Sequence, residues 1–208
     1  MLAMQYPVVI LADGDFPSHA IPLRALEQAE TIVCCDGAAE KLLMHNMNPS
    51  YIVGDLDSLP DATRMRFSDR IICETSQEIN DLTKAVEFCL KQGVQKLAIV
   101  GATGLREDHT IANISLLANY AKKCEIELIT DYGIFSAISA ATTFESFAGQ
   151  QVSIFSLMPE TPVSLDGLKY PLTNYCLDSW WKGTLNEAIG NRFTISFEKG
   201  EIIIFRVF

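Results

Sequence analysis

Two hydrophobic patterns divide the chain. In roughly the first 130 residues, short apolar runs alternate with longer stretches in which apolar residues recur at helical spacing. The short runs predict strands at 8–11, 32–35, 51–53, 70–73, 97–100 and 126–129. The longer stretches predict helices at 21–29, 38–45, 61–67, 81–92 and 109–121. This alternation indicates an α/β fold, a Rossmann-like parallel sheet with helices on both faces.

The pattern changes after about residue 132. Residues 193–197 alternate strictly between apolar and polar, and a polar turn at 198–201 leads into an apolar run at 202–208. Such strand–turn–strand patterning, without a convincing helix, predicts an antiparallel β-sandwich. We therefore expect an α/β domain over residues 1–132 and a sandwich domain over residues 133–208.

The composition is typical of a globular protein, and the net charge excludes one class of binding partner. The chain has 208 residues, of which 49% are hydrophobic and 20% charged, and this balance excludes intrinsic disorder. Sixteen Lys and Arg face 26 Asp and Glu, which gives a formal net charge of −10. Because such a chain repels a phosphate backbone, we expect no nucleic acid partner. An acidic protein that handles phosphates needs metal ions between itself and them.

The cysteines and the apolar segments indicate the cellular compartment in which the protein is expected. The six cysteines form no CxxC pair, so neither a zinc site nor a disulfide framework is indicated. Reduced thiols predict a cytoplasmic protein. The N-terminal segment lacks the basic start of a signal peptide, and no apolar stretch approaches the roughly 18 residues that span a bilayer. We therefore expect no secretion signal and no membrane partner.

Acidic residues follow several predicted strands. Asp36 follows the second strand, and Asp55 and Asp57 follow the third. The carboxyl ends of parallel strands share one edge of a sheet, where ligands bind. Side chains two apart on an extended segment point the same way, so Asp55 and Asp57 suit a hard cation such as Mg²⁺. The alternative is an Asp-rich turn or a helix cap.

Further polar residues lie at the same predicted edge. Asp81 and Lys84 are three apart at a helix start and share a face, although a first-turn acid with a solvated lysine would look the same. Gly101 and Gly104 suit a backbone that approaches phosphate, or a tight turn. Arg106 offers a fork for phosphate oxygens.

Asp108 is the last candidate site residue at this edge, and several well-known catalytic motifs are absent from the sequence. Asp108 is a fourth carboxylate at this edge, or the cap of a helix that starts at His109. The chain has no GxxxxGK[ST], no GxGxxG and no GxSxG motif, and three histidines give poor support for a catalytic triad or a zinc site. The residues favour a nucleotide-phosphate enzyme in which carboxylates hold Mg²⁺.

Several motifs occur in an order that identifies a family. They are CCDGAAEKL, YIVGDLDS, QEINDLTKAVEF, GATGLREDHTIAN, GLKYPLTN and TLNE. Together they resemble thiamine pyrophosphokinase, and Gly-Asp-x-Asp-Ser is the most specific of them. Asn80 stands where the family usually has Thr, and Leu105 stands where a second Gly is usual. The leucine at position 105 departs from the family pattern. It changes what we expect of one backbone contact in the phosphate loop and leaves the expected reaction unchanged.

The resemblance implies a reaction that composition does not reveal. ATP would donate its diphosphate group to the hydroxyl of thiamine, giving thiamine diphosphate and AMP. The resemblance implies catalytic and Mg²⁺-binding roles for Asp55, Asp57, Asp81 and Asp108. It places ATP and its phosphates at Asp36, Gln77, Lys84, Gly101, Gly104 and Arg106.

The sandwich domain would bind thiamine by the same resemblance. Thiamine is a flat cation, which suits the aromatic faces of Tyr170 and Trp180. Thr184 and Asn186 would hydrogen-bond its pyrimidine edge. Adjacent aromatics on a strand face opposite ways, so one of Trp180 and Trp181 is expected to pack inside. Family members are homodimers, and the resemblance implies an active site shared between subunits.

Two other functions remain open at this stage. The first is a related diphosphotransferase that acts on a pterin-like alcohol and shares the same phosphate site. The second is a non-catalytic sensor of a nucleotide or of thiamine. The intact set of Asp55, Asp57, Asp81, Lys84 and Arg106 argues against a sensor, which does not need groups for phosphoryl transfer.

Overall fold

The computed structural model describes residues 7–208, which form two compact units. The first unit contains residues 7–114 and 123–131, and the second contains residues 115–122 and 132–208. The first six residues belong to the segment assessed above for a signal peptide and lie outside the described residues. The domain limits expected from the sequence stay a prediction.

Strands and helices alternate in the first unit, as the sequence predicts. Its described elements are β1 (Val8–Leu11), α1 (Ala20–Glu27), β2 (Thr31–Cys35), α2 (Ala38–Met44), β3 (Tyr51–Gly54), α3 (Asp61–Arg66), β4 (Ile71–Cys73), α4 (Asp81–Lys91), β5 (Lys96–Val100), α5 (Glu107–Ala121) and β6 (Glu125–Ile129). The end of α5 belongs to the second unit. Each strand lies within one residue of its predicted limits and each helix within two. The predicted α/β fold class is confirmed.

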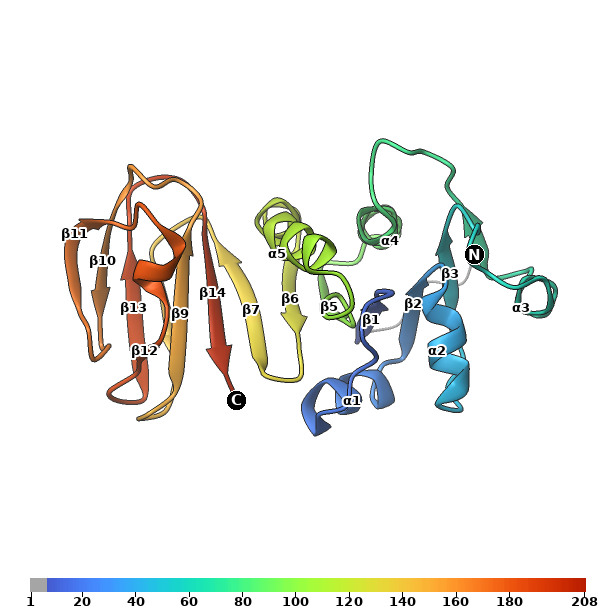
Figure 1. Ribbon diagram of the computed structural model, residues 1–208, viewed down its shortest axis with the longest axis horizontal. Coiled ribbons are helices and arrows are strands. Elements are labelled where there is room, and N and C mark those ends of the chain that lie inside the picture. The colour runs from blue at the N-terminus through green and yellow to red at the C-terminus, as the bar shows by residue number, and fades with distance from the viewer. Residues whose placement is uncertain (1–6) are drawn as a thin grey trace. The chain divides into compact units, whose positions relative to one another are not determined.

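The strands of the first unit form a parallel sheet with a reversal in its order. The order is β6-β5-β1-β2-β3-β4, and all neighbours are parallel. The chain moves outward from β1 to β4 and then crosses back to β5. Right-handed crossovers therefore place α1 and α2 on one face and α4 on the other, as Figure 1 shows. The carboxyl ends of β1 and β5 flank the point where the order reverses.

The local sequence explains why these elements form. Every residue of β1 and β2 is buried, because helices cover both faces of the sheet. Helix α4 begins after Asn80, whose side chain accepts a hydrogen bond from the backbone N–H of Thr83 at 2.9 Å. Gly93 follows the helix with a φ of 83°, a left-handed conformation that suits glycine. These signals fix where α4 begins and ends.

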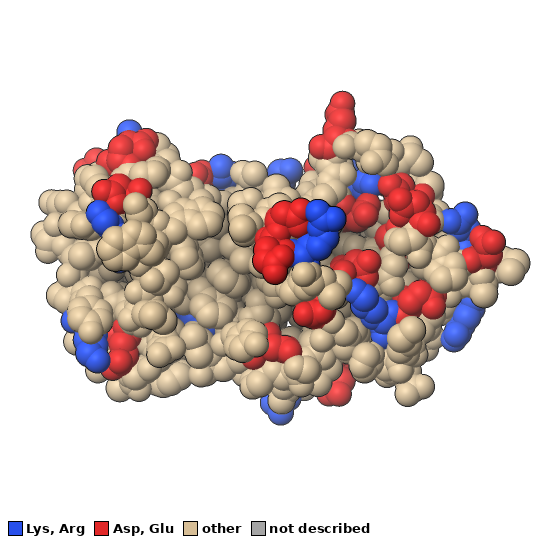
Figure 2. Space-filling model, viewed as in Figure 1, with Lys and Arg blue, Asp and Glu red and all other residues tan. Residues whose placement is uncertain are grey.

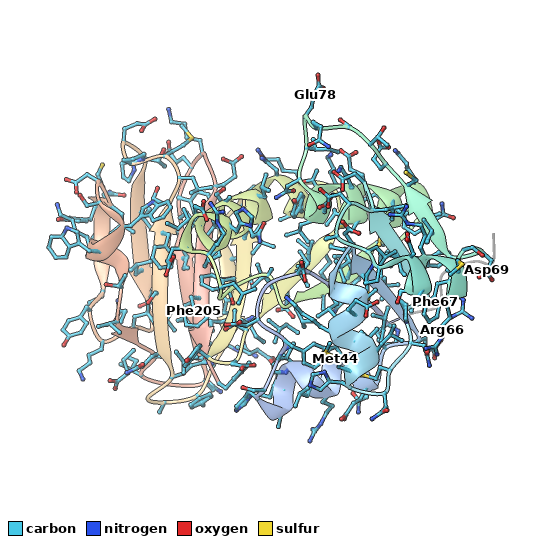
Figure 3. All side chains as sticks on the ribbon, turned by 45° about the vertical axis from the view of Figure 1, so that its right-hand side comes forward. Met44, Arg66, Phe67, Asp69, Glu78 and Phe205 are labelled. Atoms are coloured by element: carbon cyan, nitrogen blue, oxygen red, sulfur yellow. The ribbon has the colours of Figure 1, made fainter. Side chains whose placement is uncertain are left out.

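Charged side chains of both signs lie scattered over the surface of the first unit. Figure 2 shows Lys and Arg side chains beside Asp and Glu side chains on the face in view. Lys96 pairs with Glu125 at 2.5 Å across β5 and β6. At the end of α3, Arg66 lies 4.8 Å from the ring centroid of Phe67, and both residues are labelled in Figure 3. Exposed pairs of this kind contribute little to stability.

The second unit is an antiparallel β-sandwich, as predicted. Its strands are β7 (Gly133–Ile138), β8 (Thr142–Glu145), β9 (Gln151–Ser156), β10 (Pro162–Asp166), β11 (Leu172–Cys176), β12 (Asn186–Glu187), β13 (Arg192–Ser196) and β14 (Ile202–Val207). One sheet has the order β12-β9-β14-β7 and the other the order β11-β10-β13-β8. Alternating residues of both sheets form one core, which includes Val152, Ile154, Val163, Leu165, Phe193, Ile195, Ile202 and Ile204.

The sandwich differs from its prediction at two tryptophans. Trp180 and Trp181 lie in a short 3₁₀ helix, η1 (Trp180–Gly183), and not on a strand. Both side chains are exposed, so the expectation that one of them packs inside is wrong. Trp180 contacts the ring of Phe155 edge-on, at a centroid distance of 5.9 Å. Among the described helices, none combines the length and the apolar character needed to cross a membrane.

Candidate active site

The loops after β1 and β5 lie together where the strand order reverses. The backbone N–H of Gly14 donates to the carbonyl of Gly101 at 2.7 Å, and that of Asp15 donates to the carbonyl of Thr103 at 2.9 Å. A Cβ atom at position 14 would lie 2.4 Å from the carbonyl oxygen of Thr103. Only glycine fits at this position, because the two backbones approach so closely.

These loops border a cavity of about 350 Å³ in the first unit. Its lining residues come from the carboxyl ends of the strands and from the starts of α4 and α5, and they are Ala12, Asp13, Gly14, Cys35, Asp36, Ser58, Asn80, Asp81, Leu82, Ala102, Gly104, Leu105, Arg106, His109 and Asn113. A cavity in this place is the expected ligand site of an open α/β sheet.

Three carboxylates gather beside the cavity, from Asp36, Asp55 and Asp57. One oxygen of each lies within 4.8 Å of the others, a spacing that can hold a metal ion. Asp55 and Asp57 do not lie on an extended segment, because Leu56 between them has a φ of 70°. The backbone N–H of Asp57 donates to the Asp55 carboxylate at 3.3 Å and closes a turn. The two carboxylates are close because the chain turns at Leu56, and not because they lie on the same side of an extended segment as the sequence suggested.

Asp36 is the buried member of this carboxylate cluster. It is 3% exposed and has a φ of 38°. Its Oδ2 accepts hydrogen bonds from the Oγ and the N–H of Ser58, at 2.7 and 3.3 Å, while its buried Oδ1 has no partner. Burial raises the pKa of this carboxyl, with smaller contributions from the charges of Asp81 and Asp57, and the Ser58 hydrogen bonds oppose the rise. An unpartnered buried oxygen beside two more carboxylates fits a hard cation.

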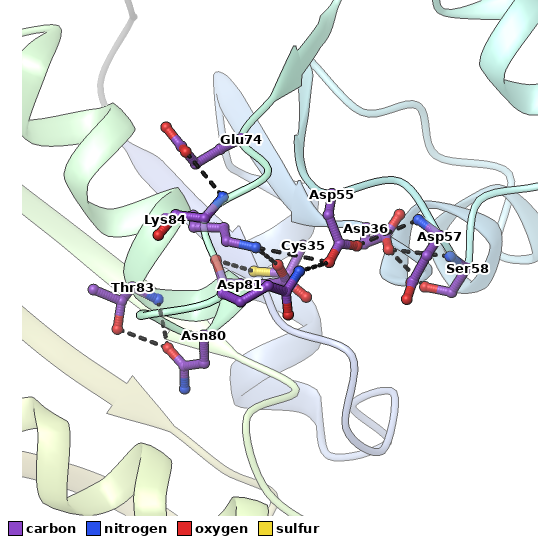
Figure 4. A network of polar contacts seen from close by, with 12 residues as sticks. Cys35, Asp36, Asp55, Asp57, Ser58, Glu74, Asn80, Asp81, Thr83 and Lys84 are labelled. Atoms are coloured by element: carbon purple, nitrogen blue, oxygen red, sulfur yellow. Dashed lines mark hydrogen bonds and ion pairs between the residues drawn. The ribbon is translucent and has the colours of Figure 1, made fainter.

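Lys84 brings a positive charge to the same cluster (Figure 4). Lys84 is 4% exposed, and its Nζ lies 2.8 Å from Asp81 Oδ1 and 4.0 Å from Asp55 Oδ2. Burial lowers the pKa of Lys84, but the hydrogen bond and charge of Asp81 and the charges of Asp55 and Glu74 outweigh it, so the pKa is raised. Lys84 is therefore charged at neutral pH. Asp81 is held by Lys84 and lies outside the group of three carboxylates.

Gln77 contacts the carboxylate cluster from the loop before α4. Its Nε2 donates to Asp55 Oδ2 at 2.9 Å. This hydrogen bond is the largest cause that lowers the pKa of Asp55, and the N–H of Asp57 and the charge of Lys84 add to it. The pKa of Asp55 is thus lowered, while that of Asp36 is raised. The two neighbouring carboxylates have opposite electrostatic environments.

The predicted phosphate loop follows β5. Gly101 and Gly104 have φ values of 66° and 78°, and Leu105 between Gly104 and Arg106 has a φ of 57°. Two hydrogen bonds join Arg106 to Asp108, Nε to Oδ1 at 3.0 Å and Nη2 to Oδ2 at 2.6 Å. The arginine lowers the pKa of Asp108 to about 2. In this structure Asp108 orients Arg106 and does not join the three clustered carboxylates.

Helix α5 begins earlier than the sequence suggested. It starts at Glu107, so Asp108 lies in its first turn and is not the residue that caps a helix starting at His109. The Asp108 carboxylate still accepts a hydrogen bond from the N–H of His109, at 2.9 Å. A carboxylate here is favoured by the positive end of the helix dipole.

Leu105 makes a testable contribution to stability. It is 65% exposed and adopts a left-handed conformation that costs a non-glycine residue about 1–2 kcal/mol. We expect Leu105→Gly to raise the free energy of unfolding by roughly 0.5–1 kcal/mol, after subtraction of the entropy that glycine adds to the unfolded chain. Urea denaturation measures this change. Ile111→Gly, at an exposed position inside α5, is the matched control and should lower stability by about 1 kcal/mol.

The predicted thiamine-binding residues lie in the sandwich unit. Tyr170 is 60% exposed and Trp180 is 47% exposed. The Thr184 hydroxyl donates to the Trp181 carbonyl at 2.7 Å. Asn186 is buried, accepts from the N–H of Tyr170 at 3.1 Å and donates to its carbonyl at 2.9 Å. Asn186 therefore holds the backbone of Tyr170 in place.

The sequence reasoning missed residues that line the cavity after β1. Asp13 and Gly14 border it, and Lys41 of α2 fixes them. Lys41 Nζ lies 2.8 Å from the Asp13 carboxylate and donates to the carbonyls of Asp13 and Gly14 at 2.9 and 2.7 Å. The signal was present, because Asp-Gly-Asp follows the first predicted strand as other acids follow the second and third.

The fold and the site define an α/β protein with a ligand site at the order reversal of a parallel sheet, joined to a β-sandwich unit. Two family models match the chain: "Thiamin pyrophosphokinase, catalytic domain" over residues 23–129 and "Thiamin pyrophosphokinase, substrate-binding domain" over residues 133–205. The chain belongs to the thiamin pyrophosphokinase family. The family and the kind of enzyme predicted from the motifs are confirmed.

Individual relatives agree with the family match. The thiamine pyrophosphokinase of Bacillus subtilis is 28% identical over 95% of this chain and 96% of its own length. A crystal structure of thiamine pyrophosphokinase from that organism has a TM-score of 0.79 at 25% identity and covers 96% of this chain and 98% of its own. The yeast thiamin pyrophosphokinase structure shares the fold, with a TM-score of 0.77 at 19% identity, covering 97% of this chain and 86% of its own.

Proposed function

We propose that this protein transfers the diphosphate group of ATP to the hydroxyl of thiamine, giving thiamine diphosphate and AMP. The thiamine oxygen attacks the β-phosphorus, and its proton passes to solvent. The bond between the β-phosphorus and the oxygen that bridges to the α-phosphorus breaks, and AMP leaves with the electron pair. The observation that carries this proposal is the family match over both units.

We propose that Asp36, Asp55 and Asp57 hold Mg²⁺. The unpartnered Oδ1 of Asp36 and the 4.8 Å spacing of the carboxylates support this, because clustered like charges are unfavourable without a cation. When bound, Mg²⁺ neutralises charge that develops on the phosphates during transfer. Asp81 and Asp108, the other two ligands implied by the family resemblance, each contact a cationic side chain and would lie beside the phosphates.

The chain's own cations and backbone amides complete the proposed phosphate site. Lys84 is charged and held by Asp81, so its position is set before ATP binds. Arg106 is held by Asp108 in an orientation that leaves it exposed at the cavity. Gly101 and Gly104 allow the backbone to approach the phosphates closely. Gln77 would contact a phosphate oxygen next to Asp55.

At the thiamine end, we propose that Tyr170 and Trp180 offer aromatic faces to the thiamine cation. Asn186 would act through Tyr170, whose backbone it holds with two hydrogen bonds. The Thr184 hydroxyl would lie near the same substrate. We also propose a homodimer that shares its active sites, and a cytoplasmic location. The family resemblance supports the dimer, and the six free cysteines fit a reducing compartment.

Incubation with ATP, Mg²⁺ and thiamine tests the proposed reaction. We expect AMP and thiamine diphosphate to form in equal amounts, and EDTA to stop the reaction because the carboxylates alone repel the phosphates. Liquid chromatography of the nucleotides and thiamine esters measures both products. ADP with thiamine monophosphate would indicate a simple kinase instead. Turnover of a pterin-like alcohol, but not thiamine, would indicate the related diphosphotransferase, and no turnover would indicate a sensor.

A further inference from the structure

An amide bridge joins two separate parts of the cavity wall. The Nδ2 of Asn80, at the start of α4, donates to Oδ1 of Asn113 in α5 at 3.2 Å. The Nδ2 of Asn113 in turn donates to the carbonyl of Ala102 at 2.9 Å. Ala102 lies between the two glycines of the proposed phosphate loop, and both asparagines line the cavity. The bridge therefore connects the start of α4 to the phosphate loop.

Asn80 uses both ends of its amide. Its Oδ1 accepts from the N–H of Thr83 at 2.9 Å and from the Thr83 hydroxyl at 2.7 Å, which caps α4. The Nδ2 remains for Asn113. The first turn of α4 carries Asp81 and Lys84 (Figure 4), so whatever fixes this turn also fixes two charged groups that, in the proposed function, lie beside the phosphates.

The phosphate loop is held on one side by the backbone hydrogen bonds from Gly14 and Asp15, and the amide bridge holds the carbonyl of Ala102 between them. Gly101 and Gly104 both have positive φ values, and glycine allows many backbone conformations. The hydrogen bond from Asn113 to the Ala102 carbonyl holds the segment between them. The same asparagine receives the bond from Asn80, so two hydrogen bonds in series link the start of α4 to the loop.

We infer that Asn80 and Asn113 are positioning residues that set the distance between Lys84 on α4 and the loop that carries Gly104 and Arg106. The inference rests on the proposed function, in which both parts contact the phosphates of ATP. Neither asparagine takes part in bond breaking. Loss of either asparagine would weaken the binding of the nucleotide more than it would weaken the binding of thiamine.

Asn80→Thr is the central test, because threonine is a good N-cap residue but has no amide to donate to Asn113. Asn113→Ala removes the other half of the bridge. We expect each variant to bind a non-hydrolysable ATP analogue with Mg²⁺ about three- to tenfold more weakly in calorimetry, as for the loss of one hydrogen bond. We expect the KM for ATP to rise by a similar factor and the KM for thiamine to change less than about twofold. The double variant should bind no more weakly than the weaker single variant.

Thr83→Val is the matched control. It removes the hydroxyl bond to Asn80 Oδ1 but keeps the amide bridge, and it should bind the analogue as wild type does. Wild-type affinity of Asn80→Thr would overturn the inference even if Asn113→Ala does not fold. Where all three variants fold, additive losses in the double variant would overturn it as well. The binding measurement does not depend on turnover. Failure of the proposed function would instead appear as wild-type protein that forms no AMP.

Discussion

The Asp36→Asn variant is expected to be more stable than the wild-type protein in EDTA and about a hundredfold less active with Mg²⁺. Asparagine keeps an oxygen that can accept the two Ser58 hydrogen bonds, and it tolerates the left-handed backbone at this position. It removes a buried charge whose second oxygen has no partner. We expect a gain of no more than about 1 kcal/mol, because the variant removes a buried charge while the Nδ2 that replaces Oδ1 is still a buried polar group without a partner.

The stability difference should depend on pH with a defined sign. The pKa of Asp36 is raised, so the folded state binds this proton more tightly than the unfolded state does. The destabilisation by Asp36 is therefore present above its folded-state pKa and is relieved as the pH falls through it. The advantage of Asp36→Asn in EDTA should shrink as the pH falls through the raised folded-state pKa of Asp36 toward the ordinary pKa of an aspartate. Urea denaturation at a series of pH values measures this.

Mg²⁺ provides the second readout for Asp36. The cation should raise the melting temperature of the wild-type protein, because it binds the folded state, and should raise that of Asp36→Asn much less. The activity loss follows because one ligand charge is gone and the phosphates are misplaced. A variant that responds to Mg²⁺ as strongly as wild type does would contradict the assignment of Asp36 as a metal ligand. A variant that is less stable than wild type in EDTA would contradict the destabilisation attributed to its buried charge.

Asp57→Asn is expected to lower kcat by about a hundredfold or more while the fold is preserved. Asp57 is exposed, so the change leaves no buried group unpaired. The loss of one ligand charge weakens Mg²⁺ binding and misplaces the phosphates, and misplacement alone costs about a hundredfold. AMP release at saturating substrates measures the rate, and circular dichroism checks the fold.

Asp69→Asn is the matched control for Asp57. Asp69 is an exposed carboxylate of the same unit, near Phe67 in Figure 3, and it lies outside the carboxylate cluster. Its activity should equal that of wild type. A folded Asp57→Asn protein with wild-type kcat, or a loss equally large in Asp69→Asn, would remove Asp57 from the site.

The sequence predicted the α/β unit well because its signals are local. Buried strands such as β1 are continuous apolar runs, and Asn80 and Gly93 mark the ends of α4. The rule that parallel strands end at one edge also brought Asp36, Asp55 and Asp57 to one place. These features depend on chain direction and hydrophobic spacing, which are visible in one dimension.

The remaining features of the site depend on pairings across space. The ion pair between Arg106 and Asp108 separates Asp108 from the other carboxylates, and spacing alone does not reveal it. The turn at Leu56 requires a left-handed leucine, which no local propensity favours. The 3₁₀ helix at Trp180 is too short to leave a periodic signal.

The buried state of Asp36 was equally invisible in the sequence. It arises because β2 and β3 lie side by side, with Gly54 against Asp36: a Cβ at position 54 would lie 2.9 Å from the Cβ of Asp36. The resemblance placed Asp36 near the nucleotide. The structure adds an unpartnered oxygen that faces no protein donor, and this is the stronger argument for a cation.

The fate of each phosphorus atom of ATP tests the central claim most directly. Three samples of ATP, labelled with ³²P at the α, β or γ position, are incubated with the wild-type protein, Mg²⁺ and thiamine, and the products are separated. The proposed transfer predicts that the β and γ labels appear together in thiamine diphosphate and that the α label stays in AMP. Transfer of the γ label alone, with the β label left in ADP, would contradict diphosphate transfer.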